Sequence, residues 1–355
     1  MTPNTFKQWI LRDANGLESL HLSSATIPST IGDYDVLVNL YFASLNYRDI
    51  LIAQGKNPFP LKKDVVPVSD GAGVVVSVGP KVTAFRAGDR VAPTFMRDHI
   101  AGPITPAAVL SSLGAVVDGT LREYGVYPEH SLVRIADNLS LLEASSLPCA
   151  GVTAWTSLYG DRYLQPCDVV LTQGTSGVSL FALQLAVAAG AVVIATTSSA
   201  EKIQLLKGLG ATHVLNYSED KNWGETAKSL TRDGAGVDIV VEVGGASSVR
   251  QSLKAVRMGG IISLVGHLDS SEPLDPPFNP VEVLASQATI RAIGAGNRQD
   301  FVALMRAIDA NHIKPVIDKK VFKMDEAREA YQHMLDRKHL GKVVIDLRGS
   351  QKLTD

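Results

Sequence analysis

A glycine-containing turn near the middle of the chain has the residue types that can hold a phosphate group. It follows the apolar run 169–172 and reads Gln173-Gly174-Thr175-Ser176-Gly177. Backbone N–H groups in such a turn, and the N-terminus of a helix after it, attract the pyrophosphate of a dinucleotide. In the usual GxGxxG spacing only Gly174 is a glycine, because Ser176 and Ser179 stand at the second and third positions. The turn therefore indicates a dinucleotide site, with an ordinary strand-to-helix turn as the alternative.

The residues about twenty positions after Gly174 indicate which dinucleotide is bound. A site for NAD places an acidic side chain there, on the ribose hydroxyl. This chain instead has Thr196-Thr197-Ser198-Ser199-Ala200-Glu201-Lys202. Small hydroxyls beside a lysine suit a phosphate on that ribose, so the sequence favours NADP over NAD. In the alternative, Ser198 and Ser199 only cap the next helix and Lys202 is a solvated surface charge.

The pattern of apolar runs changes near Asp168 and predicts two kinds of domain. Before it, short β-branched runs between turn residues predict strands at 35–40, 73–78 and 89–92. After it, apolar runs alternate with helical patterns such as 178–189. The strands predicted there are 169–172, 192–196, 213–216, 239–243, 261–265 and 290–293. This alternation predicts an α/β fold with a doubly wound parallel sheet.

The residues after about Arg298 are expected to return to the β-rich first part, because six strands already complete a dinucleotide-type sheet. They show a helical pattern at 300–310, a strand at 316–322, a second helix at 325–336 and a final strand at 342–347. The proline-rich stretch 270–280 is predicted to be a surface loop.

Composition excludes several classes of protein. The 355 residues carry 34 Lys and Arg against 36 Asp and Glu, which leaves no basic face for nucleic acid or an anionic membrane. With 45% hydrophobic residues, the chain is expected to form about two soluble domains. Its two cysteines form no CxxC pair, and the N-terminal residues show no secretion signal. The apolar stretch 178–197 contains polar residues and is interpreted as a helix, a turn and a strand. A cytoplasmic location is expected.

Several motifs follow one another in a specific order and spacing. They are Ser44–Asp49, Pro67–Gly79, Gly88–Val91, Leu147–Trp155, the Gly174 turn, Val243–Gly245 and Gly341–Ile345. Together they resemble the medium-chain dehydrogenase/reductase superfamily over nearly the whole chain. The resemblance implies a GroES-like catalytic domain made of residues 1–147 and 298–355, a Rossmann NADP-binding domain of residues 148–297, and an active site in the cleft.

The chain departs from the zinc-containing members of that family at the metal ligands. Asn46 stands where they have a cysteine, and Ser69-Asp70 stands where they have His-Glu. Cys149 remains at the third ligand position, and the region 95–120 lacks the four cysteines of a structural zinc lobe. One thiol without further strong ligands cannot close a catalytic zinc site. We therefore predict no zinc, and interpret Cys149 as a small buried apolar residue rather than a metal ligand or nucleophile.

The resemblance also implies which residues contact the cofactor. Thr153 is expected to face the nicotinamide amide, the Gly174 turn to bind the pyrophosphate, and the Ser198 segment to hold the adenosine phosphate. Strand ends and a late loop are expected to complete the site, with Lys342 reaching a cofactor phosphate. The full expected set is Thr153, Gly174, Ser176, Gly177, Val178, Ser198, Ser199, Lys202, Tyr217, Gly244, Gly266, His267, Gly296, Asn297, Arg298 and Lys342. Tyr217 is equally interpreted as a strand-end aromatic, and Arg298 as a solvated charge.

Asn46 and Tyr47 are the candidate catalytic residues, because they stand where zinc enzymes place their first ligand. An amide or a hydroxyl there can polarise a substrate oxygen, and Tyr47 can supply a proton. In the alternative, Tyr47 packs in the cleft wall and Asn46 holds backbone. Asp49 and Asp70 are expected to pair with Arg48 or backbone groups. His99 is a weaker candidate for lining the pocket.

Three functions are compatible with these residues. The first is zinc-independent, NADPH-dependent reduction of an activated C=C bond in an enone, enal or quinone, as in the family's enoyl reductases and quinone oxidoreductases. The second is a zinc-free carbonyl reductase or alcohol dehydrogenase, which would share every cofactor residue with the first. The Asn-Tyr-Arg-Asp segment is most similar to the family's alcohol dehydrogenase-like group, whose name follows sequence rather than demonstrated alcohol oxidation. The third is an NADPH-binding protein without turnover. The expected partners are a small-molecule substrate and, by the family resemblance, a second copy of the chain joined through an edge strand near 290–293.

Overall fold

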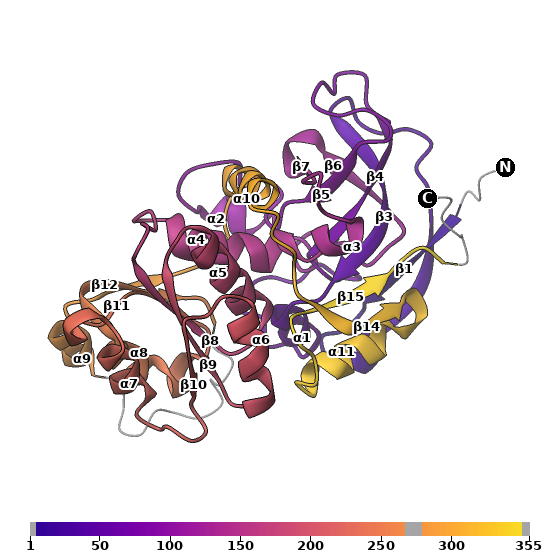
Figure 1. The fold of residues 1–355 in the computed structure, drawn as a ribbon. Coiled ribbons are helices and arrows are strands. Elements are labelled where there is room, and N and C mark those ends of the chain that lie inside the picture. The colour runs from indigo at the N-terminus through magenta and orange to yellow at the C-terminus, as the bar shows by residue number, and fades with distance from the viewer. Residues whose placement is uncertain (1–4, 267–278, 350–355) are drawn as a thin grey trace. The chain divides into compact units, whose positions relative to one another are not determined.

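The computed structural model describes residues 5–266 and 279–349 and divides into two compact units (Figure 1). The first unit is formed by Met1–Val152 and Gly296–Asp355, and the second by Thr153–Ala295. The domain boundaries predicted from the sequence, after residues 147 and 297, stay a prediction, and they fall close to these divisions. The predicted loop 270–280 lies almost entirely outside the described residues.

The first unit is built on a seven-stranded sheet with the order β14-β15-β3-β4-β5-β7, and β6 pairs with β3. Its strands are β3 (Asp35–Ser44), β4 (Asp70–Val78), β5 (Arg90–Pro93), β6 (Tyr124–Pro128), β7 (Leu132–Arg134), β14 (Ile317–Lys323) and β15 (Lys342–Asp346). A separate antiparallel hairpin consists of β1 (Thr5–Leu11) and β2 (Leu20–Thr26). The helices are α1 (Tyr47–Ala53), α2 (Pro106–Val109), α3 (Leu141–Ala144), α10 (Arg298–Ala310) and α11 (Ala327–Leu335).

The C-terminal part of the chain completes this first sheet, as the sequence predicted. Strand β15 pairs antiparallel with β3, with Val344 opposite Ser44. Aliphatic residues of these strands and aromatic residues of β6, β14 and α11 form one buried core, which includes Leu40, Tyr127, Phe322 and Tyr331. Because β3 and β15 are neighbours, the residues that follow Ser44 lie beside the start of β15.

The second unit contains a six-stranded parallel sheet with the order β10-β9-β8-β11-β12-β13. Its strands are β8 (Val169–Gln173), β9 (Val192–Thr197), β10 (His213–Asn216), β11 (Val237–Glu242), β12 (Val256–Leu264) and β13 (Thr289–Ala292). Its helices are α4 (Val152–Tyr159), α5 (Gly177–Ala188), α6 (Ile203–Gly208), α7 (Trp223–Ser229), α8 (Val249–Ala255) and α9 (Pro280–Ser286). The chain steps from β8 to β9 in one direction along the sheet and from β11 to β12 in the other. Because such connections are right-handed, α5 and α8 cover opposite faces of the sheet (Figure 1).

The strand order of the second unit reverses between β8 and β11, which is the arrangement of a dinucleotide-binding sheet. Each of the six strands predicted for this part overlaps an observed one. The largest difference is β12, which begins at Val256 rather than at Ile261. The expected helix 325–336 is also shorter, because a 3-10 turn (Met324–Glu326) precedes α11.

Among the described residues, no helix combines the length and the apolar character that crossing a membrane would require.

Candidate functional site

In the first unit, the predicted catalytic residue Asn46 lies between β3 and α1. Its backbone N–H donates to Asp49 Oδ2 at 2.8 Å, so Asp49 stabilises the start of the helix. The Asn46 side chain makes no cap bond to α1 and instead contacts two residues from distant parts of the sequence. Its Oδ1 accepts from Lys342 Nζ at 2.5 Å, and its Nδ2 donates to Ser69 Oγ at 3.4 Å.

Lys342, the first residue of β15, places its ammonium inside this unit, where the side chain is 3% exposed. Besides Asn46, Nζ donates to the Leu45 carbonyl at 2.7 Å and to Asp70 Oδ2 at 3.3 Å. An ammonium has three N–H donors, and here each has an acceptor. A contact of Lys342 with a cofactor phosphate stays a prediction, and it would require one of these bonds to be exchanged.

Asp70 begins β4 and has no exposed side-chain surface. Its Oδ1 accepts from Ser69 Oγ at 3.0 Å, and the Thr120 hydroxyl holds its backbone carbonyl at 2.7 Å. Asp70 therefore pairs with Lys342, and the expectation of Arg48 or backbone partners is wrong for this carboxylate. Sequence spacing could not reveal the pair, because the two residues are 272 positions apart.

Asp49, whose carboxyl group is buried in the first turn of α1, has a strongly perturbed pKa. Burial raises the pKa of Asp49 to about 6, and the Arg48 guanidinium and the Asn46 backbone N–H oppose this rise. Arg48 is the partner expected from the sequence, with Nη1 3.5 Å from Asp49 Oδ1. Arg48 also donates to the Leu113 carbonyl at 3.0 Å and lies over the Phe95 ring. It is therefore held between α1 and the loop 95–120.

Tyr47 and His99 make no hydrogen bond that the described residues show to the cluster of Asn46, Ser69, Asp70 and Lys342. Tyr47 is half-buried at the first position of α1, and no hydrogen bond of its hydroxyl is found among the described residues. His99 is buried, and its Nε2 lies 3.1 Å from the Gly102 carbonyl. A hydroxyl without a protein partner can donate to a substrate. In His99 only Nε2 has a partner, and Nδ1 is buried without one among the described residues.

The donors at the three expected ligand positions do not fit zinc. Asn46 offers an amide that is bound to an ammonium, and Ser69 offers a hydroxyl bound to Asp70. Burial raises the pKa of the Cys149 thiol to about 12, so the thiolate that zinc binds is disfavoured. No group of three or more His, Cys, Asp or Glu side chains able to hold a metal occurs within residues 5–266 and 279–349. Cys149 is half-buried rather than fully buried, which corrects the expectation for its packing.

In the second unit, the Gly174 turn lies at the carboxyl end of β8 and has the geometry of a phosphate cradle. Gly174 has φ +70°, and a Cβ built on it would meet nothing within 4 Å. The N-terminus of the twelve-residue helix α5 follows, and the Ser176 side chain does not cap it. Ser176 Oγ instead contacts Ser179 Oγ at 2.9 Å, and Ser179 donates to the Gln173 carbonyl at 2.5 Å. The first N–H groups of α5 are therefore free of side-chain caps beside an open glycine.

The residues expected to hold an adenosine phosphate lie at the ends of the two neighbouring strands. Ser198, Ser199 and Lys202 follow β9, and the exposed Tyr217 follows β10. Lys202 Nζ donates to Thr175 Oγ1 at 3.2 Å, so this half-buried lysine is not a fully solvated charge. Ser199 precedes a 3-10 turn (Ala200–Lys202) without a side-chain cap bond. Thr175, which the sequence reasoning did not select, links the two segments.

A buried carboxyl group, also missed from the sequence, positions the next strand end. Glu242, the last residue of β11, accepts from the backbone N–H groups of Gly244 and Gly245 at 2.8 and 2.9 Å. Gln173 Nε2 donates to Glu242 at 2.7 Å, and the hydroxyls of Ser248 and Ser252 also donate to it. A charged residue at the end of an apolar strand was the available signal, because such residues are rarely buried without partners.

The other expected cofactor residues are distributed over both units. Thr153 is buried in α4, Val178 is in the first turn of α5, and Gly266 follows β12, whereas His267 lies outside the described residues. Gly296, Asn297 and Arg298 belong to the first unit. There Asn297 Oδ1 accepts from the Asp300 N–H at 3.0 Å, and Arg298 Nε donates to the Leu132 carbonyl at 3.1 Å. Their roles toward a cofactor stay predictions.

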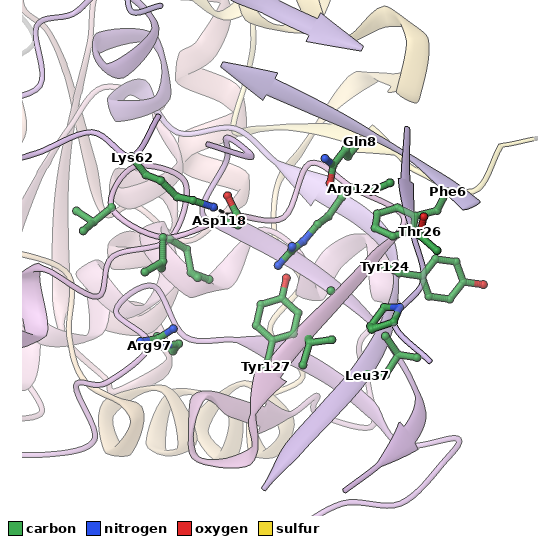
Figure 2. A pocket seen from close by; sticks show the side chains of 17 residues that line it. Phe6, Gln8, Thr26, Leu37, Lys62, Arg97, Asp118, Arg122, Tyr124 and Tyr127 are labelled. Atoms are coloured by element: carbon green, nitrogen blue, oxygen red, sulfur yellow. Dashed lines mark hydrogen bonds and ion pairs between the residues drawn. The ribbon is translucent and has the colours of Figure 1, made fainter. Parts of the chain in front are cut away.

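A pocket of about 680 Å³ lies in another part of the first unit. Figure 2 shows the side chains that line it. Its lining includes the ion pair between Lys62 Nζ and Asp118 Oδ2, which are 2.6 Å apart, and the side chains of Arg122 and Tyr127. None of the residues selected from the sequence lines this pocket.

Comparison with known proteins identifies relatives along nearly the whole chain. Residues 32–137 match the alcohol dehydrogenase GroES-like domain, and residues 177–310 match the zinc-binding dehydrogenase family. A zinc-type alcohol dehydrogenase-like protein of Schizosaccharomyces pombe is 41% identical over 94% of this chain and 97% of its own. The structure of a putative alcohol dehydrogenase from Sinorhizobium meliloti is 39% identical, covers 98% of this chain and all of its own, and superposes with a TM-score of 0.89. The chloroplastic NADPH-dependent alkenal/one oxidoreductase of Arabidopsis thaliana is 27% identical over 97% of this chain and 80% of its own.

Proposed function

The chain belongs to the medium-chain dehydrogenase/reductase superfamily, and from that premise we propose that it is a zinc-independent, NADPH-dependent reductase of activated C=C bonds. It is an oxidoreductase of this superfamily. The proposal for its reaction depends on one observation, namely that the amide of Asn46 and the hydroxyl of Ser69 stand at two of the expected metal-ligand positions, and that an ammonium is bonded to the amide.

The second unit has the features that a nicotinamide dinucleotide requires. The open Gly174 turn and the uncapped N-terminus of α5 suit a pyrophosphate. We propose that Thr153, Ser176, Gly177, Val178, Gly244 and Gly266 complete this site, with the Glu242 network holding Gly244 in place. The nicotinamide, when bound, supplies a hydride.

The proposed preference for NADPH depends on the side chains after β9 and β10. Lys202 provides a positive charge beside Thr175, and Ser198 and Ser199 provide small donors with no acidic residue at the end of β9. A phosphate on the ribose would gain a charge-assisted hydrogen bond from Lys202. The Arabidopsis relative is described as NADPH-dependent, which is consistent with this preference.

The reaction we propose adds a hydride to the β carbon of an enone, enal or quinone and a proton to the α carbon. As the hydride adds, negative charge develops on the substrate oxygen, and hydrogen-bond donors stabilise it in place of a Lewis acid until the proton arrives. The half-buried Asn46 has an amide N–H beyond the one that Ser69 accepts, and the Tyr47 hydroxyl has no protein partner among the described residues. We assign charge stabilisation to these two donors, with Tyr47 or water as the proton source.

The experiment that tests this proposal is product analysis with an α,β-unsaturated aldehyde. The protein is treated with a chelator, freed of metal, and incubated with NADPH and the aldehyde. A saturated aldehyde, formed at the same rate before and after chelation, supports the proposal. An allylic alcohol would replace it with carbonyl reduction, a function favoured by the alcohol dehydrogenase descriptions of the two more similar relatives. Bound NADPH without product from aldehyde, ketone or quinone would instead indicate a non-catalytic binding protein.

A further inference from the structure

We propose that Lys342 is a positioning residue. Its buried ammonium orients the Asn46 amide so that one N–H bond of the amide faces the substrate. The inference rests on the proposed function, because it concerns the donor that we assign to the reaction. The inference assigns Lys342 a role in orienting Asn46, in place of the contact with a cofactor phosphate that the sequence predicted.

The evidence is a closed ring of four side chains. Lys342 donates to Asn46 Oδ1, Asn46 Nδ2 donates to Ser69 Oγ, Ser69 donates to Asp70 Oδ1, and Asp70 Oδ2 accepts from Lys342. The contacts measure 2.5, 3.4, 3.0 and 3.3 Å in that order. Lys342 and Asp70 are 3% and 0% exposed, so water does not compete for these bonds. The ring therefore holds Asn46 from the protein side.

The chemistry of the ring permits only one direction for its hydrogen bonds. An ammonium is a donor without acceptor capacity, and a carboxylate is an acceptor without a donor. If the Asn46 amide were rotated by 180°, its NH₂ group would face the ammonium at 2.5 Å, donor against donor. The ammonium thus keeps Oδ1 inward and the NH₂ group on the other side of the amide.

The orientation leaves a donor available. Asn46 Nδ2 carries two hydrogens, and the bond to Ser69 uses one of them. Asn46 is half-buried, and the proposal places the second hydrogen on the exposed side of the residue, toward the substrate. The ammonium also withdraws electron density through Oδ1, which strengthens the remaining N–H as a donor. Without Lys342, the amide could turn its oxygen toward the substrate oxygen and repel the charge that develops there.

The charge of Lys342 cannot be removed alone, because Asp70 would be left as an unpaired buried charge. We would therefore compare Lys342→Met/Asp70→Asn with Asn46→Ala, with the combination of all three changes, and with the wild type. The matched control is Lys62→Met/Asp118→Asn, which removes an ion pair of the same unit that lines the Figure 2 pocket. Turnover with the enal, the Kd for NADPH and thermal unfolding are measured for each.

We expect Asn46→Ala to lower kcat about a hundredfold, which is typical for loss of one donor to a developing oxyanion. Lys342→Met/Asp70→Asn should lower kcat at least about tenfold with an unchanged Kd for NADPH. The variant that combines all three changes should lose no more kcat in total than Asn46→Ala alone. The control pair should retain wild-type kcat. Additive losses, or a wild-type kcat in Lys342→Met/Asp70→Asn, would overturn the positioning role.

A readout without turnover separates this inference from the proposed reaction. In protein labelled with ¹⁵N-asparagine, the Asn46 Nδ2 hydrogen that is bonded to Ser69 should exchange slowly with solvent, and Lys342→Met/Asp70→Asn should make this exchange fast. If these signals behave as expected but no substrate is reduced, the orientation of Asn46 by Lys342 is supported and the proposed function fails. If Asn46→Ala has wild-type turnover, the donor role and this inference fail together. Unchanged Asn46 signals in Lys342→Met/Asp70→Asn would overturn the inference even in an active enzyme.

Discussion

The ionisation of Asp49, which accepts from the Asn46 N–H beside the ring of Asn46, Ser69, Asp70 and Lys342, should be visible in the stability of the whole protein. Burial raises its pKa from 3.8 to about 6. Below about pH 4 the carboxyl group is protonated in both states, and between about pH 4 and 6 only the unfolded chain loses this proton. The contribution of Asp49 to the free energy of unfolding should therefore fall by about 3 kcal/mol as the pH rises through that window.

Asp49→Asn provides the comparison, because an amide has no such ionisation and its oxygen can still accept from the Asn46 N–H. We expect the difference in the free energy of unfolding between wild type and variant to shift by up to about 3 kcal/mol against the wild type from pH 4 to pH 7. Urea denaturation at intervals of half a pH unit measures it. A difference that is independent of pH, or that shifts in favour of the wild type, would contradict the raised pKa.

At the residue scale, the sequence could select positions from motifs but could not predict most of the contacts that their side chains make. Asn46, Asp49 and Lys342 were selected from motifs, and two of them now share a buried cluster with Ser69 and Asp70. Their partners could not be predicted, because Lys342 and Asn46 are 296 positions apart and meet through the pairing of β15 with β3. The position of Lys342 at the start of the apolar strand β15 is a signal that its charge is buried with a partner, but it does not identify that partner.

At the element scale, cofactor preference should be determined by the segment after β9 and its contact with the β8–α5 turn. Lys202→Ala removes the charge that lies 3.2 Å from Thr175. We expect the Kd for NADPH to rise about tenfold, since a hydrogen bond between charged groups contributes roughly 1.5 to 3 kcal/mol. The Kd for NADH should not change, because NADH lacks the phosphate. Fluorescence titration of both cofactors measures the two values.

Lys207→Ala is the matched control for this change, because Lys207 is exposed in the adjacent helix α6 and should leave both affinities as they are. Equal weakening of NADPH and NADH by Lys202→Ala would assign Lys202 to the fold of the turn. An unchanged Kd for NADPH would remove it from the cofactor site.

The elements of the second unit were more predictable than those of the first. Parallel strands buried on both faces read as continuous apolar runs, and the predicted strand 169–172 is β8 to within one residue. In the first unit, the predicted strand 35–40 continues to Ser44, because pairing with β15 near the end of the chain extends it. The Glu242 network was missed for a similar reason, since Gln173 and Glu242 meet only when β8 and β11 become neighbours.

At the scale of the whole molecule, the end of the parallel sheet predicts self-association. Strand β13 is the last strand in the sheet order, so its outer edge has no strand partner among the described residues. Nearby in sequence, Leu284 in α9 is 67% exposed, and Met258 in β12 is 72% exposed. An open strand edge favours pairing with an identical edge across a two-fold axis, and exposed apolar side chains of β12 and α9 would add apolar contact area if they lie within it.

We therefore expect a homodimer with twice the chain mass of 37.8 kDa in light scattering coupled to size-exclusion chromatography. Leu284→Lys should shift the mass toward that of the monomer at micromolar concentration, because each dimer would bring two new charges to an apolar contact. Leu110→Lys, at a 48% exposed position of the first unit, should leave the mass unchanged. A wild-type mass of one chain at every concentration would contradict the dimer. A stable dimer in Leu284→Lys would remove α9 from the contact and leave the edge of β13 as the surface to test.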